Sequence, residues 1–191
     1  MESYIGIESD KTRRFSEKQN NTKLCWATCI NMVLKYHNIV NYSQEKIVSM
    51  AFKKDQLGNS PNKGANISTI EKVLKKCLEN EGMQDKIIVA PLQSKIDEVT
   101  IPQSLNRKDI IILDVNISES DSEGHAVVVI GVCYNKENIN YNLPPELVIV
   151  QDPLLDPADK THQGRRQYKW DEFKKIAGKY IVIHSEYPDT I

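Results

Sequence analysis

No stretch of this sequence is apolar for long enough to span a membrane. The longest apolar runs, at residues 110–115 and 126–134, have the length of β-strands, whereas a transmembrane helix needs roughly 18 apolar residues. The first fifteen residues, MESYIGIESDKTRRF, are polar and charged and contain no hydrophobic signal core. We therefore expect no membrane span, and either a cytoplasmic protein or one that is secreted without a signal peptide or after trimming.

An excess of charge of either sign is also absent. The 25 Lys and Arg residues are balanced by 26 Asp and Glu residues, which gives a formal net charge of -1. A chain without a basic field has no general attraction for nucleic acid, so we expect no nucleic-acid partner. Hydrophobic residues still make up 40% of the 191 residues, which is enough for one folded domain with a buried core.

Cysteine is scarce, with only four residues at positions 25, 29, 77 and 133. In a chain of this length without a signal peptide, free thiols are expected rather than disulfides. Cys77 and Cys133 lie in apolar patterns typical of small core residues. A zinc site at Cys25 and Cys29 is disfavoured, because no matching Cys or His pair follows downstream. We expect no metal and no cofactor.

The order of predicted elements is helices first and strands second, which is the α+β pattern. We expect a single domain over residues 1–191, with a helical half at about 19–106 packed on an antiparallel sheet at about 107–191. Helices are predicted at residues 24–36, 43–54, 67–78, 93–99 and 170–176. Strands are predicted at residues 4–7, 87–90, 110–116, 125–134, 147–151 and 180–184. Turns are expected at residues 118–124, 135–145 and 153–167.

Residues that suit thiol catalysis occur at the ends of these elements. Cys25 falls in the first turn of the helix at 24–36, where the positive end of the helix dipole favours the reactive thiolate. His125 follows Gly124 as the first residue of a strongly apolar strand, which can hold the ring rigidly at the edge of a cleft. Cys29, one helical turn beyond Cys25, is expected to pack in the core.

An acidic residue is expected to orient His125 and fix its tautomer. Asp152 closes the predicted strand at 147–151 and precedes Pro153, which ends that strand. Asp114 competes for the role from within the neighbouring strand. We favour Asp152, because residues at strand ends reach clefts more easily than residues within strands. The order cysteine, histidine, aspartate then matches a nucleophile, a general base and an orienting group.

Gln19 lies six residues before Cys25 and is the fourth candidate. An amide side chain beside the nucleophile can donate a hydrogen bond to an oxyanion, which a carboxylate cannot do. Asn20 and Asn21 are the local alternatives for this role, and an ordinary surface glutamine is the alternative interpretation of Gln19.

Together these motifs resemble those of the papain-like cysteine proteases. The segment QNNTKLCWATC at residues 19–29 is similar to the signature in which a glutamine precedes Cys-Trp-Ala by six residues. GHAVVVIGV at 124–132 and VIVQDP at 148–153 are similar to the strands that carry the family's histidine and third member. YKWDEFKK at 168–175 is similar to a segment of bacterial members. Within this family, the sequence most resembles the bacteriocin leader-peptidase-like, the staphopain-like and the plant-pathogen effector proteases.

The resemblance implies a papain-like fold and a role for each candidate residue. Cys25 would attack the scissile carbonyl, and His125 would pair with it and later protonate the leaving amine. Asp152 would stand where many members have asparagine. Gln19 and the Cys25 backbone N–H would form the oxyanion hole, and Trp26 would pack beside the nucleophile.

Two departures indicate a compact bacterial branch rather than a cathepsin. Thr22, Lys23 and Leu24 replace the Cys-Gly-Ser that precedes the nucleophile in plant and lysosomal members, and the histidine follows after 100 residues (125 − 25), against roughly 130 in those members. The 18 residues before Gln19 are too few for an inhibitory prosegment. No transporter segment is present, so we do not expect a leader peptidase fused to an exporter.

The predicted function is a cysteine endopeptidase that hydrolyses protein or peptide substrates through a Cys-His-Asp triad and an acyl-enzyme. The alternatives are an acyl- or amide-transfer enzyme (transglutaminase, deamidase or transpeptidase) with the same triad, and a catalytically silent papain-like binding module. A separate inhibitor or activator protein is a further expected partner. Glu119, Asp121 and Glu123 would favour basic substrate residues if their loop overhangs the cleft, but a solvated acidic turn is the simpler interpretation.

Overall fold

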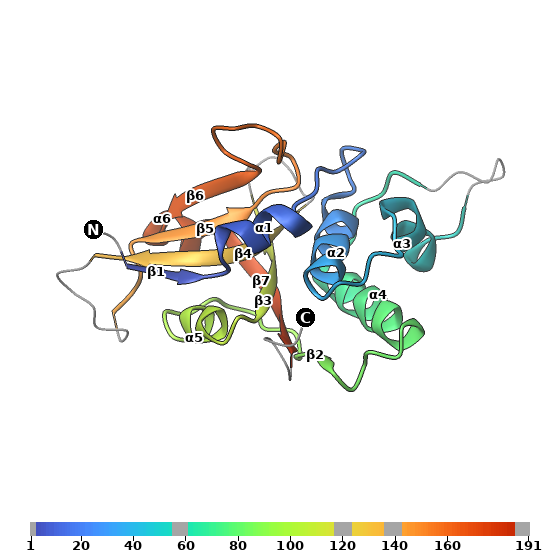
Figure 1. Ribbon diagram of the computed structural model, residues 1–191, viewed down its shortest axis with the longest axis horizontal. Coiled ribbons are helices and arrows are strands. Elements are labelled where there is room, and N and C mark those ends of the chain that lie inside the picture. The colour runs from blue at the N-terminus through green and yellow to red at the C-terminus, as the bar shows by residue number, and fades with distance from the viewer. Residues whose placement is uncertain (1–2, 55–60, 117–123, 136–142, 186–191) are drawn as a thin grey trace.

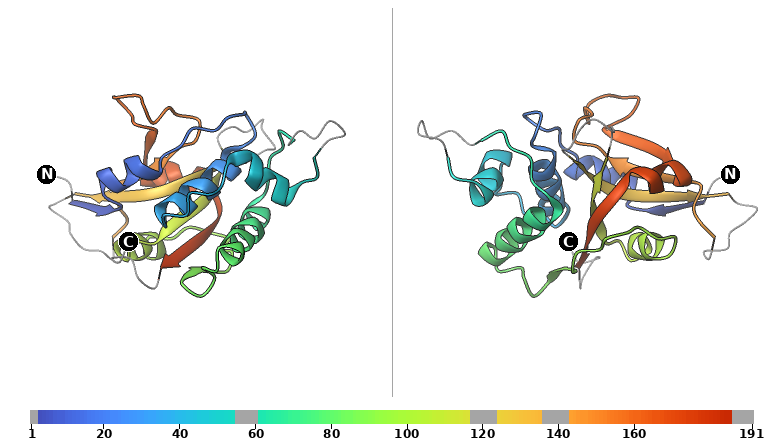
Figure 2. Two further views of the ribbon diagram at one scale, coloured as in Figure 1. Left: turned by 45° about the vertical axis from the view of Figure 1, so that its right-hand side comes forward. Right: turned by 180° about the vertical axis from the view of Figure 1, so that it is seen from behind.

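The computed structural model describes residues 3–54, 61–116, 124–135 and 143–185. It contains an antiparallel sheet, and the helices between residues 25 and 80 gather beside one part of it (Figures 1 and 2). The helices are α1 (Ser9–Phe15), α2 (Cys25–Tyr36), α3 (Gln44–Ala51), α4 (Ile67–Asn80), α5 (Thr100–Asn106) and α6 (Trp170–Ile176). The strands are β1 (Ser3–Gly6), β2 (Ile87–Val89), β3 (Ile110–Val115), β4 (His125–Tyr134), β5 (Leu147–Gln151), β6 (Arg165–Lys169) and β7 (Ala177–Ser185).

The strands pair in the order β2-β7-β3-β4-β5-β6, and every pairing is antiparallel. The ten residues of β4 are all buried. The first half of β4 pairs with β3, its second half pairs with β1, and its other side pairs with β5. Residues 128–133 of β4 therefore have paired neighbours on both sides, and His125, at the start of the strand, is held by its pairing with Val115 of β3.

The two faces of the sheet carry separate apolar layers. On one face, alternate residues such as Ile112 and Val128 pack against α2 and α4. On the other face, residues such as Leu113 and Val127 pack against Ile101 of α5 and against side chains of α6. This alternation is the period-2 pattern of strands, and both of its phases are apolar because both faces are covered. The α+β class predicted from the sequence is confirmed.

The central helix α2 begins at Cys25 and is buried over its first ten residues. Thr28 lies in the first turn of this buried stretch. Its hydroxyl group donates a hydrogen bond of 2.9 Å to the Leu24 carbonyl one turn earlier. Helix α2 packs against β4 on one side and against α1, α3 and α4 on others. A helix that is apolar nearly all round is covered on all sides in this way.

Three elements differ from the sequence prediction. The helix expected at 93–99 lies later, at Thr100–Asn106. Just before it, the Asp97 carboxylate accepts hydrogen bonds from the backbone N–H groups of Val99 and Thr100, which favours a turn at residues 97–100. The segment Arg165–Lys169, expected within a turn, is the strand β6 at the edge of the sheet.

The polar segment before residue 20 was predicted to hold only a strand, but it also forms α1, which buries Thr12 and Phe15 one turn apart. Most of the turns expected at 118–124 and 135–145, with the acidic residues Glu119, Asp121 and Glu123, lie outside the described residues.

Candidate active site

Three of the four candidate residues lie at the ends of regular elements. Cys25 is the first residue of α2, His125 is the first residue of β4, and Asp152 directly follows β5. β5 pairs with β4, and α2 packs on β4, so β4 is the element that links all three. Pro153 has no N–H to continue the ladder and follows Asp152, which explains where β5 ends.

The side chains of these residues meet around His125. Its Nε2 lies 2.7 Å from Oδ1 of Asp152, and the neighbouring Cys25 side chain acts to raise the pKa of its ring. The backbone N–H of Ala126 donates to the Cys25 sulfur over 3.4 Å. Exposure falls along the series, from 9% for His125 and 7% for Cys25 to 0% for Asp152. The reacting end of the site is therefore the part that remains open to solvent.

The surroundings of His125 favour its charged form. Burial acts against the protonated ring, but the hydrogen bonds to Asp152 and Cys25, with the negative charges of both groups, outweigh it and raise the pKa of His125 from 6.5 to about 9. For Asp152, burial acts to raise the pKa, and the hydrogen bond and charge of His125 reverse this and lower it overall. A charged imidazolium held between a thiol and a carboxylate is the arrangement that nucleophilic thiol chemistry requires.

Each oxygen of the Asp152 carboxylate has its own neighbour. Oδ1 accepts the His125 hydrogen bond and a second one of 2.9 Å from the Leu154 backbone N–H. Oδ2 lies 3.0 Å from Nε of Arg166 on β6 in an ion pair. The pair lacks hydrogen-bond geometry, since neither atom has a hydrogen-bond partner among the described residues. Arg166 therefore balances the buried carboxylate chiefly through its charge.

Asp114, the competing acidic residue, lies on β3 and not at the end of β5. It pairs in register with Ala126, and its carboxylate occupies the space beside Gly124 that a Cβ would need. Burial raises the pKa of Asp114, and the nearby His125 charge acts in the opposite direction. Within the described residues, His125 forms its carboxylate hydrogen bond with Asp152 and not with Asp114.

Gln19 lies in the segment that leads into α2. Its backbone N–H donates to the Pro153 carbonyl over 2.9 Å, which ties this segment to the residue after Asp152. Its side-chain Nε2 donates to the Asn21 carbonyl over 2.7 Å. An amide NH₂ carries two hydrogens, so one remains for a second acceptor. Asn20 instead contacts α3, because its side chain donates to Glu45 and its backbone N–H to Gln44.

Two other residues of α2 support this site. Trp26 is fully buried, donates from Nε1 to the Lys63 carbonyl over 2.9 Å, and packs edge-on against Phe52. Cys29 is fully buried, and burial together with the neighbouring Cys25 and Asp152 raises its pKa well above the ordinary value. Cys29 therefore stays protonated and acts as a packing residue. All four cysteines are free thiols.

The described parts of the chain provide no alternative centre of a different kind. Within them, no three or more His, Cys, Asp or Glu side chains are grouped in a way that could hold a metal ion. No helix in these parts combines the length and apolar character needed to cross a membrane.

Sequence reasoning did not find Arg166, although the structure places it against the buried carboxylate. It lies on β6, whose sequence RRQYK has no β-branched residue and no apolar alternation. Edge strands are often charged in this way. In the sequence, Arg165 and Arg166 are two adjacent basic residues within the turn expected at 153–167, and nothing connects them with Asp152 until the strand is known.

Comparisons with known proteins give a consistent result. Residues 15–187 match the model of the Peptidase_C39 like family. Among solved structures, the fold is similar to the crystal structure of the peptidase domain of Streptococcus ComA, described as a bi-functional ABC transporter involved in a quorum-sensing pathway. The TM-score is 0.57 at 18% identity, with 90% of this chain and 98% of that one covered. No curated protein sequence matches the chain.

Proposed function

This chain belongs to the Peptidase_C39 like family and is a cysteine peptidase with a papain-like fold, and we propose that it is an endopeptidase whose triad is Cys25, His125 and Asp152. One observation carries the proposal. Nε2 of His125 lies 2.7 Å from a buried carboxylate, and the sulfur of Cys25, at the start of a helix, lies 3.4 Å from the backbone nitrogen of the next residue, Ala126.

In the proposed reaction, the Cys25 thiolate attacks the scissile carbonyl carbon, and a C–S bond forms as the carbonyl oxygen takes up the negative charge. The Cys25 backbone N–H is not used by the helix's own hydrogen bonds, because Cys25 is its first residue. This N–H and the second hydrogen of the Gln19 amide would stabilise the oxyanion. The developing charge is thereby met by fixed donors.

The C–N bond then breaks, and the His125 imidazolium gives its proton to the leaving amine. The acyl-enzyme that remains is a thioester on Cys25. Neutral His125 accepts a proton from water, whose oxygen attacks the thioester carbonyl and releases the acid and the thiolate. Asp152 keeps the ring in one orientation throughout, because its Oδ1 is itself fixed by the Leu154 N–H.

An epoxide affinity probe tests whether the thiol is activated. We expect one label per chain, on Cys25, because Cys29 and Cys77 are fully buried and burial raises the pKa of both thiols. Peptide mapping by mass spectrometry locates the label, which should persist in Cys77→Ala. A chain that remains unlabelled would contradict the proposal and favour a binding module. Digestion in ¹⁸O-water distinguishes hydrolysis, which places ¹⁸O in the new C-terminus, from transfer to an amine.

The pH dependence tests the role of His125. Since the leaving amine takes its proton from the imidazolium, kcat/KM should fall as the pH rises through the His125 pKa of about 9. The hydrogen bond to Asp152 is among the interactions that raise this pKa, so Asp152→Asn should move the basic midpoint down toward 6.5. The measurement is kcat/KM on a non-titrating peptide from about pH 5 to 10. A midpoint near 6.5 in the wild type would contradict this assignment.

A further inference from the structure

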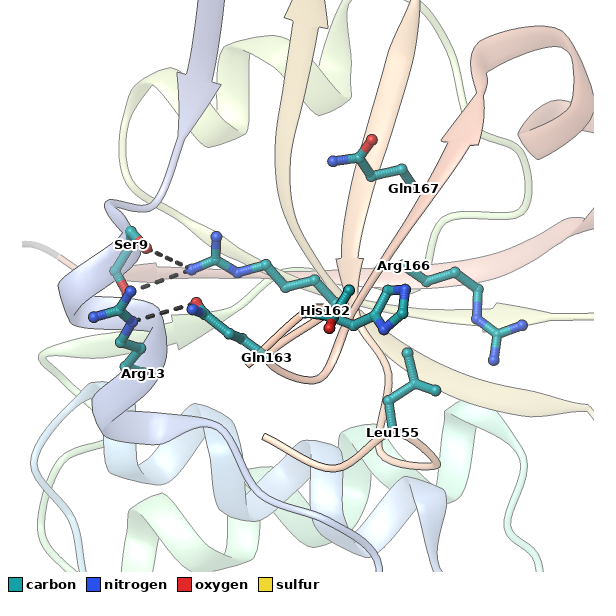
Figure 3. A pocket seen from close by; sticks show the side chains of 9 residues that line it. Ser9, Arg13, Leu155, His162, Gln163, Arg166 and Gln167 are labelled. Carbon is teal, nitrogen blue, oxygen red and sulfur yellow. Dashed lines mark hydrogen bonds between the residues drawn. The ribbon is translucent and has the colours of Figure 1, made fainter. Parts of the chain in front are cut away.

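A cavity of about 850 Å³ lies beside the proposed triad, between α1, the edge strand β6 and the segment that follows Asp152. Figure 3 shows Arg13 with Ser9 and Gln163 on one side, and Arg166 extending from the other. The cavity is lined by Ser9, Arg13, Leu155, Thr161, His162, Gln163, Arg165, Arg166 and Gln167.

The wall of this cavity is strongly basic. It holds three arginines and a histidine, and none of its lining residues is a carboxylate. Three of its basic side chains already face a carboxylate: Arg166 lies 3.0 Å from Asp152, His162 lies 2.9 Å from Asp159, and Arg13 lies 3.9 Å from Asp10. Arg165 has no ion pair among the described residues, so its charge, together with that of the loosely paired Arg13, is left for a ligand to balance.

The two arginines farthest from the triad make mostly neutral contacts. Arg165 donates from Nη2 to the Ser9 hydroxyl over 2.8 Å, and its buried Nε has no hydrogen-bond partner among the described residues. Arg13 donates to the Gln163 side chain over 3.3 Å. Its ion pair with Asp10 is 3.9 Å long, with both side chains largely exposed, so the pair contributes little. Both guanidinium groups can thus donate hydrogen bonds to a bound carboxylate without first losing a strong ion pair.

The cavity adjoins the proposed active site on the Asp152 side. Leu155 lies in its wall and donates its backbone N–H to the Asp152 carbonyl over 3.0 Å. Arg166 lines the cavity and forms the ion pair with the Asp152 carboxylate. Two residues of the cavity wall thus contact Asp152, the third member of the proposed triad.

We propose that this cavity is a subsite for an acidic residue of the peptide substrate, whose carboxylate binds Arg13 and Arg165. The inference rests on the proposed function and adds a preference to it. Guanidinium groups bind carboxylates through paired, charge-assisted hydrogen bonds. Only one side chain of the wall, Leu155, is aliphatic, so an apolar substrate residue would gain little and would strip water from the arginines.

A library of peptides from a digested proteome tests the preference. Among the peptides that the wild-type protein cleaves, Asp and Glu should be enriched at one fixed position relative to the scissile bond. For a selected peptide, Glu should exceed Gln at that position by about tenfold in kcat/KM. Arg165→Gln and, separately, the exposed Arg13→Gln should reduce this ratio toward one and leave kcat/KM on the Gln peptide unchanged within about threefold. Raising the salt concentration should also reduce the ratio.

The outcomes separate the two proposals. If no peptide is cleaved beyond a Cys25→Ala blank, the proposed function fails. In that case, fluorescence anisotropy of the Glu- and Gln-rich peptides on Cys25→Ala still tests the cavity, with tighter Glu binding expected and lost in Arg165→Gln. Cleavage without acidic enrichment, enrichment for Lys or Arg, or a Glu preference that survives both substitutions would overturn the subsite.

Discussion

Replacing Cys25 with alanine is expected to abolish peptide hydrolysis, with kcat/KM reduced by about 10⁴-fold or more. The thioester intermediate cannot form without the sulfur, and no other thiol can take its place. Cys29 lies on the same helix one turn away, but it is fully buried, and its pKa is raised well above the ordinary value. The measurement is kcat/KM on a fluorogenic peptide at about pH 7.5, with circular dichroism to verify folding.

Cys29→Ala is the matched control for this substitution. It removes one sulfur atom from the same helix and should lower the free energy of unfolding by about 1 kcal/mol, while kcat/KM stays within about threefold of the wild type. Equal losses in Cys25→Ala and Cys29→Ala would show that the helix rather than the Cys25 thiol is responsible. Substantial hydrolysis by Cys25→Ala would remove Cys25 from the mechanism.

Replacing Asp152 with alanine is expected to lower kcat/KM by about 10²- to 10³-fold, within the range of general acid–base effects. The His125 ring then loses the acceptor at 2.7 Å that holds its orientation. Arg166 also loses its buried counter-ion at 3.0 Å. Because the Arg166 side chain is 37% exposed, water compensates in part, and we expect the free energy of unfolding to fall by about 2 kcal/mol. Kinetics and chemical denaturation measure the two effects separately.

Two further variants separate positioning from stability. Asp152→Asn retains an oxygen that can accept from Nε2 of His125, so it should keep more activity than Asp152→Ala. The double variant Asp152→Ala with Arg166→Met removes both charges and should recover most of the lost stability but none of the lost activity. If its activity recovers together with its stability, Asp152 is a structural residue and not an orienting one.

The positions of Cys25, His125 and Asp152 were predictable because each lies where a strong pattern begins or ends. The apolar helix begins at Cys25, the apolar strand begins at His125, and Pro153 stops the strand after Gln151. The ends of strands and the starts of helices lie at the edges of packed layers. A clear apolar pattern in the sequence therefore also indicates where its element begins or ends. Asp152 was favoured over Asp114 only on its place at a strand end, because the contact itself depends on how β3 and β5 are placed around β4.

The surroundings of the proposed triad were harder to predict than the positions of Cys25, His125 and Asp152. α1 is seven residues long and buries only Thr12 and Phe15, and β6 is a charged edge strand. Neither has a periodic apolar pattern, because an element with little buried surface needs none. Arg13 and Arg166 lie on these two elements. Thus both the counter-ion of Asp152 and the basic cavity come from segments whose sequences contain the least information on their structure.

The hydrogen-bonding of β4 on both sides has a consequence for how the protein loses activity. Segments at the centre of a sheet exchange their amide hydrogens only when the whole molecule opens, whereas edges fray alone. Residues 128–133 of β4 pair with β3 and β1 on one side and with β5 on the other, so this segment is among the last to open. His125 begins the same strand and pairs with Val115 of β3. Fraying at β6 would loosen Arg166 while the central segment of the histidine's strand stays paired.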